Sequence, residues 1–587
     1  MKKITSLLLA FAMLLGSLLA LTSCGEPKDD GAEISVYLGE KVYDFDPTDY
    51  YVDSNAEQVM SLLYDPLFSV NEKGKLKCDG AAKKYKVDEE ERTIVIELKE
   101  TYWSDLIRVK AEDYVYAWRN VLLNPNNANP AAALLYDIEN ALEVKLGEKT
   151  IYELGVSATD TYELTITYRE GADYKQLLKN LASVATAPIR QDIATNIASG
   201  YWSKIANTAV TNGPFIIKSV DNVNNSFTIG RNEGYHQDPT IKNTTKIVRP
   251  SILVSLTARG EGETALSYAD LLEKTVFYMG DASLEDRKEY KKKATVSDDL
   301  STYTYVFNLE NELFAIKKVR QALSMAIDRE AIIEAITFGK AATGFLPDSV
   351  LSSAKGKSFN KKVDDLISTS EAIADAKALL SSVDLTGIDR SFELTVNDDE
   401  ESLAIASIVK TAWESLDAGL SVKIKAVGTI STAISPDVSS EPIEDSEIQV
   451  LVNNAARGDR DFDVIAVDWQ MYSTDAFVAL ASFSSYMNGN GAQHGVPRLN
   501  VSGWWSADYD HHLDTAYKAD SAKDKKEALK SAEEILLDSC AVIPVVYNQS
   551  FAFVSKDVSK VSYDAFGNFS LKKAVQKNYH KYLNSEE

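Results

Sequence analysis

Short apolar strands alternate with helix-patterned segments along the whole chain, which leaves few fold classes open. Residues 93–98 and 162–168 alternate apolar and polar side chains, as half-buried strands do. Residues 111–120, 319–336 and 521–537 carry helical spacing or helix end signals. This order predicts mixed α/β domains. Because the chain has 587 residues, more than one hydrophobic core normally holds, we expect two or three domains.

The N-terminal segment has the order of a secretory signal. Two lysines precede an apolar run over residues 4–21, and Leu-Thr-Ser-Cys-Gly follows. The Leu-Thr-Ser-Cys sequence resembles the lipobox of bacterial lipoproteins, in which the cysteine is acylated and becomes the first residue. We therefore expect a signal peptide over 1–23, lipid attachment at Cys24 and a polar tether over 24–32. A secreted protein with an incidental cysteine and an uncleaved membrane helix are the alternatives.

The charge of the chain limits its partners. Its formal net charge is −25, so its surface repels phosphate backbones and anionic lipids, and we expect no nucleic-acid binding. No later apolar stretch approaches the roughly 18 residues that span a bilayer, which predicts a soluble body on the tether. After Cys24 only Cys78 and Cys540 remain, so no disulfide framework is predicted.

Motifs for catalysis and for metal binding are missing. None of the five histidines lies in His-Glu-x-x-His, and the adjacent His511 and His512 point in two directions on a helix. Residues 260–265 fit a loose dinucleotide fingerprint, but two glutamates inside the loop would face a pyrophosphate. We therefore expect no cofactor and no metal, and binding rather than enzymatic function.

Two segments read as surface loops. Residues 430–463 are rich in acidic residues, serine and proline, which predicts an exposed acidic insertion. Residues 488–495 contain Asn-Gly repeats, which favour turns with positive φ.

Several distinctive segments follow one another along the chain: Phe45-Asp46-Pro47, Leu62-Leu63-Tyr64-Asp65-Pro66-Leu67, Tyr102-Trp103-Ser104-Asp105, Val109 to Trp118, Asn212-Gly213-Pro214-Phe215, Arg231 to Tyr235, Val319 to Arg329, Phe462-Asp463-Val464 with Asp468-Trp469, and Ala532 to Tyr547. In this order they resemble the extracytoplasmic solute-binding proteins of oligopeptide and dipeptide ABC transporters (family 5). We expect Trp103 and Trp118 to be buried packing residues rather than ligand contacts.

The resemblance implies a two-lobed, periplasmic-binding-protein-like (class II) α/β fold with an additional small α/β domain. The implied division is a discontinuous lobe I over 33–50, 186–304 and 541–587, an extra domain over 51–185 and a lobe II over 305–540. The chain would be a monomer that closes on a ligand between its lobes.

The resemblance also implies that a peptide ligand pairs with strands of the protein by strand addition. The residues expected to contact the ligand are Tyr50, Tyr51, Asp53, Ser54, Tyr303, Tyr305, Asp468, Trp469, Gln470, Tyr472 and Asp475. Ordinary core or surface strands remain the alternative for the aromatic residues among them.

At two positions the chain departs from the family pattern. Family members place an Asp three residues after the Trp, where it pairs with the ligand ammonium, and here that position is Tyr472. Asp475 is our first candidate to replace this carboxylate and Asp468 the second, unless the ligand has no free amine. The Gly expected after Asp105 is Leu106, which predicts a rebuilt turn.

We therefore expect an extracytoplasmic, lipid-anchored protein that captures peptides and delivers them to an ABC permease in the membrane. The alternatives are the same fold with another solute (a sugar, a nickel chelate or a modified peptide), a lipoprotein that senses peptides, and an extracellular enzyme.

Overall fold

The computed structural model describes residues 33–39, 42, 44–49, 54–126, 129–196, 202–203, 209–221, 226–232, 234–236, 253–258, 266–351, 353–354, 357–360, 365–434, 442–487 and 500–577. The expected signal peptide, Cys24, the tether and the segments 260–265 and 488–495 lie outside these residues. Within them, no helix is both long and apolar enough to cross a bilayer.

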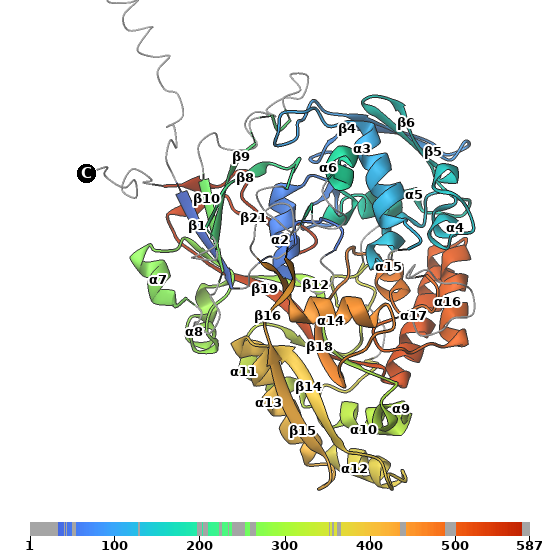
Figure 1. Cartoon of the computed structure of the whole chain (residues 1–587), viewed down its shortest axis with the longest axis vertical. Helices are drawn as coiled ribbons and strands as arrows, with labels where there is room; N and C mark the ends of the chain where they lie inside the picture. The colour runs from blue at the N-terminus through green and yellow to red at the C-terminus, as the bar shows by residue number, and fades with distance from the viewer. Residues whose placement is uncertain are drawn as a thin grey trace, which may run out of the picture.

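One mixed sheet of eleven strands runs through the molecule (Figure 1). Its order is β15 (Ser421–Val427), β14 (Ser391–Asn397), β18 (Val464–Gln470), β12 (Thr295–Phe307), β19 (Val542–Val554), β11 (Tyr278–Met279), β1 (Glu33–Gly39), β10 (Leu253–Ala258), β9 (Ser226–Arg231) and β8 (Phe215–Asp221), with β13 (Lys340–Ala341) beside β19.

The two long strands β12 and β19 join the two ends of this sheet. They pair over 295–298 with 549–552 and again over 302–306 with 542–547, and the register breaks between Asp298 and Thr302. We call the part with β1 and β8 to β11 half-sheet I and the part with β14, β15 and β18 half-sheet II. Because the ladder is interrupted between them, the break has the form of a hinge.

Half-sheet II is covered by helices and has its own hydrophobic core. Residues 319–336, expected as one helical stretch, form two helices, α10 (Lys317–Met325) and α11 (Arg329–Ile336). The prediction of a single helix is wrong because the Asp328 side chain caps the second helix by accepting a hydrogen bond from the Ala331 N–H. The helix predicted over 521–537 is confirmed as α17 (Ala522–Ser539), which Ser521 caps.

The segment 430–463 is not simply an exposed insertion. It contains the paired strands β16 (Thr429–Ile434) and β17 (Pro442–Ser446) and the helix α14 (Glu447–Ala455). Ile448, Leu451 and Val452 of α14 are buried in the core. The composition misled the prediction because most of the acidic residues of the segment lie before and after α14, whereas the helix itself holds one acid, Glu447, and an apolar face.

A small domain packs beside the long sheet. Its antiparallel sheet has the order β4 (Ala82–Asp88), β5 (Thr93–Leu98), β7 (Glu163–Thr167) and β6 (Val156–Asp160), which confirms the two predicted strands. The predicted helix begins as α3 (Ala111–Tyr116) and continues as a π-helical turn, η1 (Ala117–Leu122). Trp103 and Trp118 are fully buried, as predicted.

The remaining helices connect these layers. They are α2 (Ser54–Leu63), α4 (Ala141–Lys145), α5 (Tyr174–Asn180), α6 (Gln191–Asn196), α7 (Tyr268–Glu273), α8 (Leu284–Glu289), α9 (Glu312–Ala315), α12 (Ile373–Ser381), α13 (Glu400–Glu414), α15 (Ala476–Ala481) and α16 (Ala507–Lys518), with short turns η2 (Pro130–Leu135), η3 (Ile151–Glu153), η4 (Val184–Thr186) and η7 (Lys291–Lys293). Short strand pairs join β2 (Ser69–Val70) to β3 (Leu76–Lys77), β20 (Val558–Ser559) to β23 (Val575–Gln576) and β21 (Ser562–Tyr563) to β22 (Phe569–Ser570).

Two side-chain details bear on the sequence predictions. Cys78 and Cys540 are both free thiols. Leu106, at the position where the family has Gly, adopts φ +67° and is exposed, so this turn uses the left-handed backbone without a glycine.

Candidate ligand-binding site

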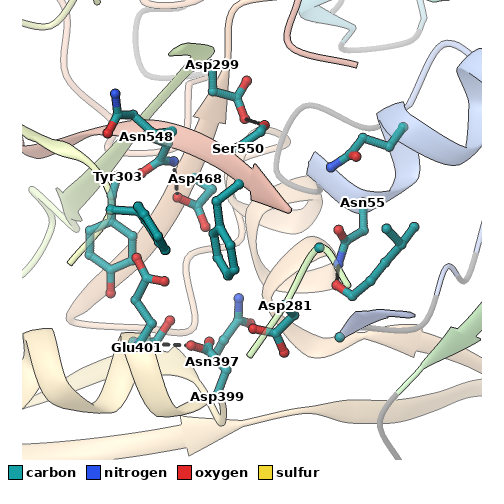
Figure 2. Close-up of a pocket in the computed structure, with 18 of the residues that line it drawn as sticks. Asn55, Asp281, Asp299, Tyr303, Asn397, Asp399, Glu401, Asp468, Asn548 and Ser550 are labelled. Carbon is teal, nitrogen blue, oxygen red and sulfur yellow. Dashed lines mark hydrogen bonds between the residues drawn. The ribbon is translucent and has the colours of Figure 1, made fainter. Parts of the chain in front are cut away.

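A cavity of about 170 Å³ lies beside the register break between β12 and β19. Its lining comes from both halves of the sheet and from α2, α8 and α13, as Figure 2 shows for most of these residues. The lining residues are Leu38, Gly39, Asn55, Gln58, Gly280, Asp281, Arg287, Asp299, Tyr303, Phe338, Asn397, Asp399, Glu401, Ser402, Asp468, Asn548, Gln549, Ser550 and Phe551. A ligand held here would touch both lobes at the hinge.

Asp468 lies in the cavity wall on β18, directly opposite Tyr303 in the β12 register. Its carboxylate accepts a hydrogen bond of 2.6 Å from Asn548 Nδ2, which also donates to Ser301 Oγ. Burial raises the pKa of Asp468 to about 7, and the nearby Glu401 adds to this rise. No described lysine or arginine forms an ion pair with Asp468, so its charge is left for something else to neutralise.

Asp299, at the register break of β12, is a second carboxylate in the wall. Ser550 Oγ donates to its Oδ2 at 3.0 Å, and burial raises its pKa to about 6. The adjacent Asp298 turns to Lys340, with the two charged atoms 2.8 Å apart. The lysine therefore neutralises the neighbour rather than the cavity residue.

Arg287 of α8 connects the two halves of the sheet. Its Nη2 lies 2.9 Å from Asp281 Oδ1, its Nη1 contacts Glu401 of α13, and the guanidinium lies over the Phe551 ring. Burial raises the pKa of both carboxyl groups, and Arg287 opposes that rise. Because α8 follows half-sheet I and α13 follows β14 of half-sheet II, this ion pair crosses the hinge.

One edge of β18 is open beside the cavity. β14 pairs with β18 only at Leu394 with Val464 and Thr395 with Ile465, whereas β12 pairs along the full length of β18. Among the described strands, none pairs with residues 466–470 on the β14 side. Main-chain groups at such an edge can bind an extended segment.

The structure brings two of the predicted contact residues, Tyr303 and Asp468, to the cavity. Tyr303 is 4% exposed, and its hydroxyl makes no hydrogen bond within the described residues, although Ser402 lies close enough to oppose the rise of its pKa. Tyr305 is in the core instead, with its ring centroid 5.6 Å from that of Trp413. Trp469 is buried and stacks on Phe483 at 4.7 Å, on the β18 face away from Asp468.

Three further predicted residues lie near the end of β18 but are not part of the lining. Gln470 is 2% exposed, and neither polar atom of its amide has a partner among the described residues. Tyr472 has φ +55°, and its hydroxyl lies 3.4 Å from the Thr48 carbonyl oxygen. Asp475 caps α15 by accepting from the Phe477 N–H, and it pairs with Lys525 at 3.4 Å.

The other predicted contacts fall in a segment that is mostly outside the described residues. Tyr50, Tyr51 and Asp53 are not described, and Ser54 is described only by its backbone, as the first residue of α2. Their roles stay predictions.

Sequence reasoning missed most of the lining. The available signal in the sequence was a polar break in each of two long strands. The breaks are Asn548, Gln549 and Ser550 in β19, and Asp298 and Asp299 in β12. Asp399 and Glu401 gave no such signal, because acids at a helix start are ordinary. Among the described residues, no three His, Cys, Asp or Glu side chains group in a way that could hold a metal ion.

A cavity at the hinge of two lobes is typical of solute-binding proteins. Residues 79–491 match the family model "Bacterial extracellular solute-binding proteins, family 5 Middle", and the chain belongs to this family. The periplasmic murein peptide-binding protein MppA of Escherichia coli is 26% identical over 495 residues, which cover 83% of this chain and 82% of that protein. The resemblance stated from the sequence is thereby confirmed.

Solved structures confirm the predicted fold class. The pheromone receptor PrgZ superimposes with a TM-score of 0.77 at 21% identity, covering 93% of this chain and all of that one. A structure of Escherichia coli MppA gives 0.73 at 22% identity, covering 93% of this chain and 98% of that one. The MppA structure described as the unliganded open form gives only 0.55, at 22% identity over 94% and 98% of the two chains.

Proposed function

We propose that this protein captures peptides between its lobes and delivers them to an ABC permease. The observation that carries the proposal is the cavity at the hinge, where the part-buried Asp468 carboxylate accepts a hydrogen bond from the Asn548 amide and forms no ion pair with a described residue. Leaving such a charge unpaired costs several kcal/mol, and a ligand ammonium would offset that cost. The relatives named for peptides support the choice of solute.

Asp468, rather than Asp475, is the residue we assign to the ligand ammonium. Asp468 lines the cavity, whereas Asp475 is engaged by Lys525 and by the start of α15. The open edge of β18 over 466–470 would hold the peptide backbone by strand addition, which tolerates any side chain. Tyr472, where the family has its carboxylate, would then belong to the wall that closes on Thr48.

The experiment that tests this function is mass spectrometry of ligand released from protein purified under native conditions, followed by calorimetry. A peptide in the released material supports the proposal. Free peptides should bind at least tenfold tighter than their N-acetylated forms, at about 1.4 kcal/mol per decade. A sugar or a metal chelate as the bound solute would contradict it and favour the same fold with a different ligand.

The lipid anchor at Cys24 and the contact with a permease are part of the same proposal. Cys24→Ala should leave the protein unprocessed or release it from the membrane fraction, because the acylated cysteine would be the attachment point. Normal processing with unchanged membrane partitioning would contradict the anchor. Loss of peptide uptake on deletion of the gene would support transport, and a changed response to peptide without lost uptake would favour a sensor.

A further inference from the structure

The cavity has an excess of negative charge. Among the described residues that line it, five side chains are carboxylates and one, Arg287, is a cation. Asp281 and Glu401 share that guanidinium. The other three carboxylates, Asp299, Asp399 and Asp468, form no ion pair with a described residue.

The carboxylates lie in two groups. In Figure 2, Asp299 and Asp468 lie with Asn548 and Ser550 at the hinge strands, and Asp281, Asp399 and Glu401 lie together near the start of α13. The groups are close enough that the charges of Asp399 and Glu401 help to raise the pKa of Asp468. One ammonium at Asp468 would leave the second group with more negative charge than Arg287 neutralises.

The second group is shaped for contact with a ligand. Asp399 caps α13 by accepting from the Ser402 N–H with Oδ1 at 2.8 Å, which leaves its other oxygen for the cavity. The buried Tyr303 hydroxyl makes no hydrogen bond with a described residue, and Phe338 supplies apolar wall. An unpartnered polar atom beside carboxylates and an apolar surface suits an aliphatic stem that ends in a cation.

We infer that the cavity selects peptides whose first residue carries a side-chain cation, such as lysine, in addition to the α-ammonium. This inference rests on the proposed function. The α-ammonium would pair with Asp468, beside Asp299, and the side-chain cation would lie at Asp399 and Glu401. A neutral first residue would fill the same space and leave the second group unneutralised.

Calorimetry with Lys-Ala-Ala and norleucine-Ala-Ala tests the inference, because norleucine keeps the stem and lacks the charge. The lysine peptide should bind at least tenfold tighter, and acetylation of its side-chain amine should remove the advantage. In Asp399→Asn the preference should fall below threefold, since Asn preserves the helix cap while removing the charge. Asp375→Asn, on exposed α12 at the far tip of the lobe, is the matched control and should keep the full preference.

The outcomes separate the two proposals. Equal binding of both peptides would overturn the inference and leave peptide binding intact. Failure of both peptides to bind, with the fold verified by circular dichroism, would overturn the proposed function itself. A tenfold preference for the lysine peptide that persists in Asp399→Asn would show that another group binds the side-chain cation. It would also overturn the assignment of that cation to Asp399.

Discussion

Asp65 is a buried carboxylate and Asp468 is a part-buried one, and their surroundings differ. Asp65, beside the small domain, has Lys572 at 3.6 Å and His236 Nε2 at 2.9 Å. Burial alone would raise its pKa, but Lys572, His236 and Lys99 outweigh burial and lower it. Asp468, in the cavity, accepts a hydrogen bond from the Asn548 amide and has no ion-pair partner among the described residues, and burial raises its pKa to about 7.

This difference separates two uses of a buried acid. The region around Asp65 supplies its own cations, so the charge is satisfied within the fold and stabilises it. The cavity leaves Asp468 without a cation, so its ionisation works against folding until a ligand arrives. Of these two carboxylates, the one that the protein does not neutralise is the one that lines the cavity.

The largest expected effect comes from removing the satisfied charge. Asp65→Asn should lower the free energy of unfolding by about 3 kcal/mol, because it breaks a buried pair and leaves Lys572 without its carboxylate. We take the low end of the usual range because the Lys572 side chain keeps 23% exposure to water. Urea unfolding at pH 7.5 measures this change. A loss of unfolding free energy no larger than that of a surface substitution would contradict the distinction between Asp65 and Asp468.

The unsatisfied charge should behave in the opposite way. Asp468→Asn should weaken Lys-Ala-Ala binding at least 30-fold, about 2 kcal/mol, while the unfolding free energy of the ligand-free protein stays equal or increases at pH 7.5. Within the described part of the chain, the removed charge has no ion-pair partner and accepts a hydrogen bond from the Asn548 amide. Calorimetry and urea unfolding of the same preparation test both parts. A variant that is destabilised as strongly as Asp65→Asn would contradict the distinction.

The pH dependence of binding follows from the raised pKa of Asp468. The groups that face it are Asn548, Tyr303, Asp299, Asp399 and Glu401, and none of them is a cation. Below pH 7 the carboxyl is largely protonated, so an ammonium must displace the proton, and affinity should rise up to tenfold per pH unit between pH 5.5 and 7.

The same raised pKa determines the direction in which the stability of the ligand-free protein changes with pH. Because the folded pKa of about 7 exceeds the usual value of 3.8, the stability contributed by this group is present at low pH and is lost as the pH rises toward 7. In Asp468→Asn, the pH dependence of peptide affinity and the pH dependence of the unfolding free energy should both weaken. Calorimetry in two buffers of different ionisation enthalpy should show proton release on binding by the native protein, and no release would contradict the assignment.

The sequence predicted the architecture better than the site. The half-buried strands and the motifs around Trp103 and Trp118 depend on local patterns and on burial, so they could be read directly. The break between α10 and α11 was missed because a single Asp cap interrupts a continuous helical pattern. The fold class followed from many weak matches in one order.

The wall of the cavity could not be predicted because it depends on register. Asp468 meets Asn548 only through the pairing of β18, β12 and β19, which joins residues 80 positions apart. Glu401 and Asp281 meet through Arg287 across the hinge. The sequence favoured Asp475 as the partner of the ligand ammonium because it lies close to Tyr472 along the chain. In the fold, Asp475 instead caps α15.

We expect the smallest effect from Asp475→Asn. This variant tests the distinction between a neutralised and an unneutralised carboxylate on the segment that follows β18. Asn keeps the cap of α15, and only the charge opposite Lys525 is lost. The pair is 3.4 Å apart, and Lys525 also lies 5.5 Å from the centroid of the Phe477 ring, so the cost should be about 1 kcal/mol of unfolding free energy. Binding of Lys-Ala-Ala should change less than twofold, because this carboxylate is already neutralised. A tenfold loss of affinity without loss of stability would instead show that Asp475 reads the ligand ammonium, and that neutralisation within the fold does not separate structural acids from binding ones.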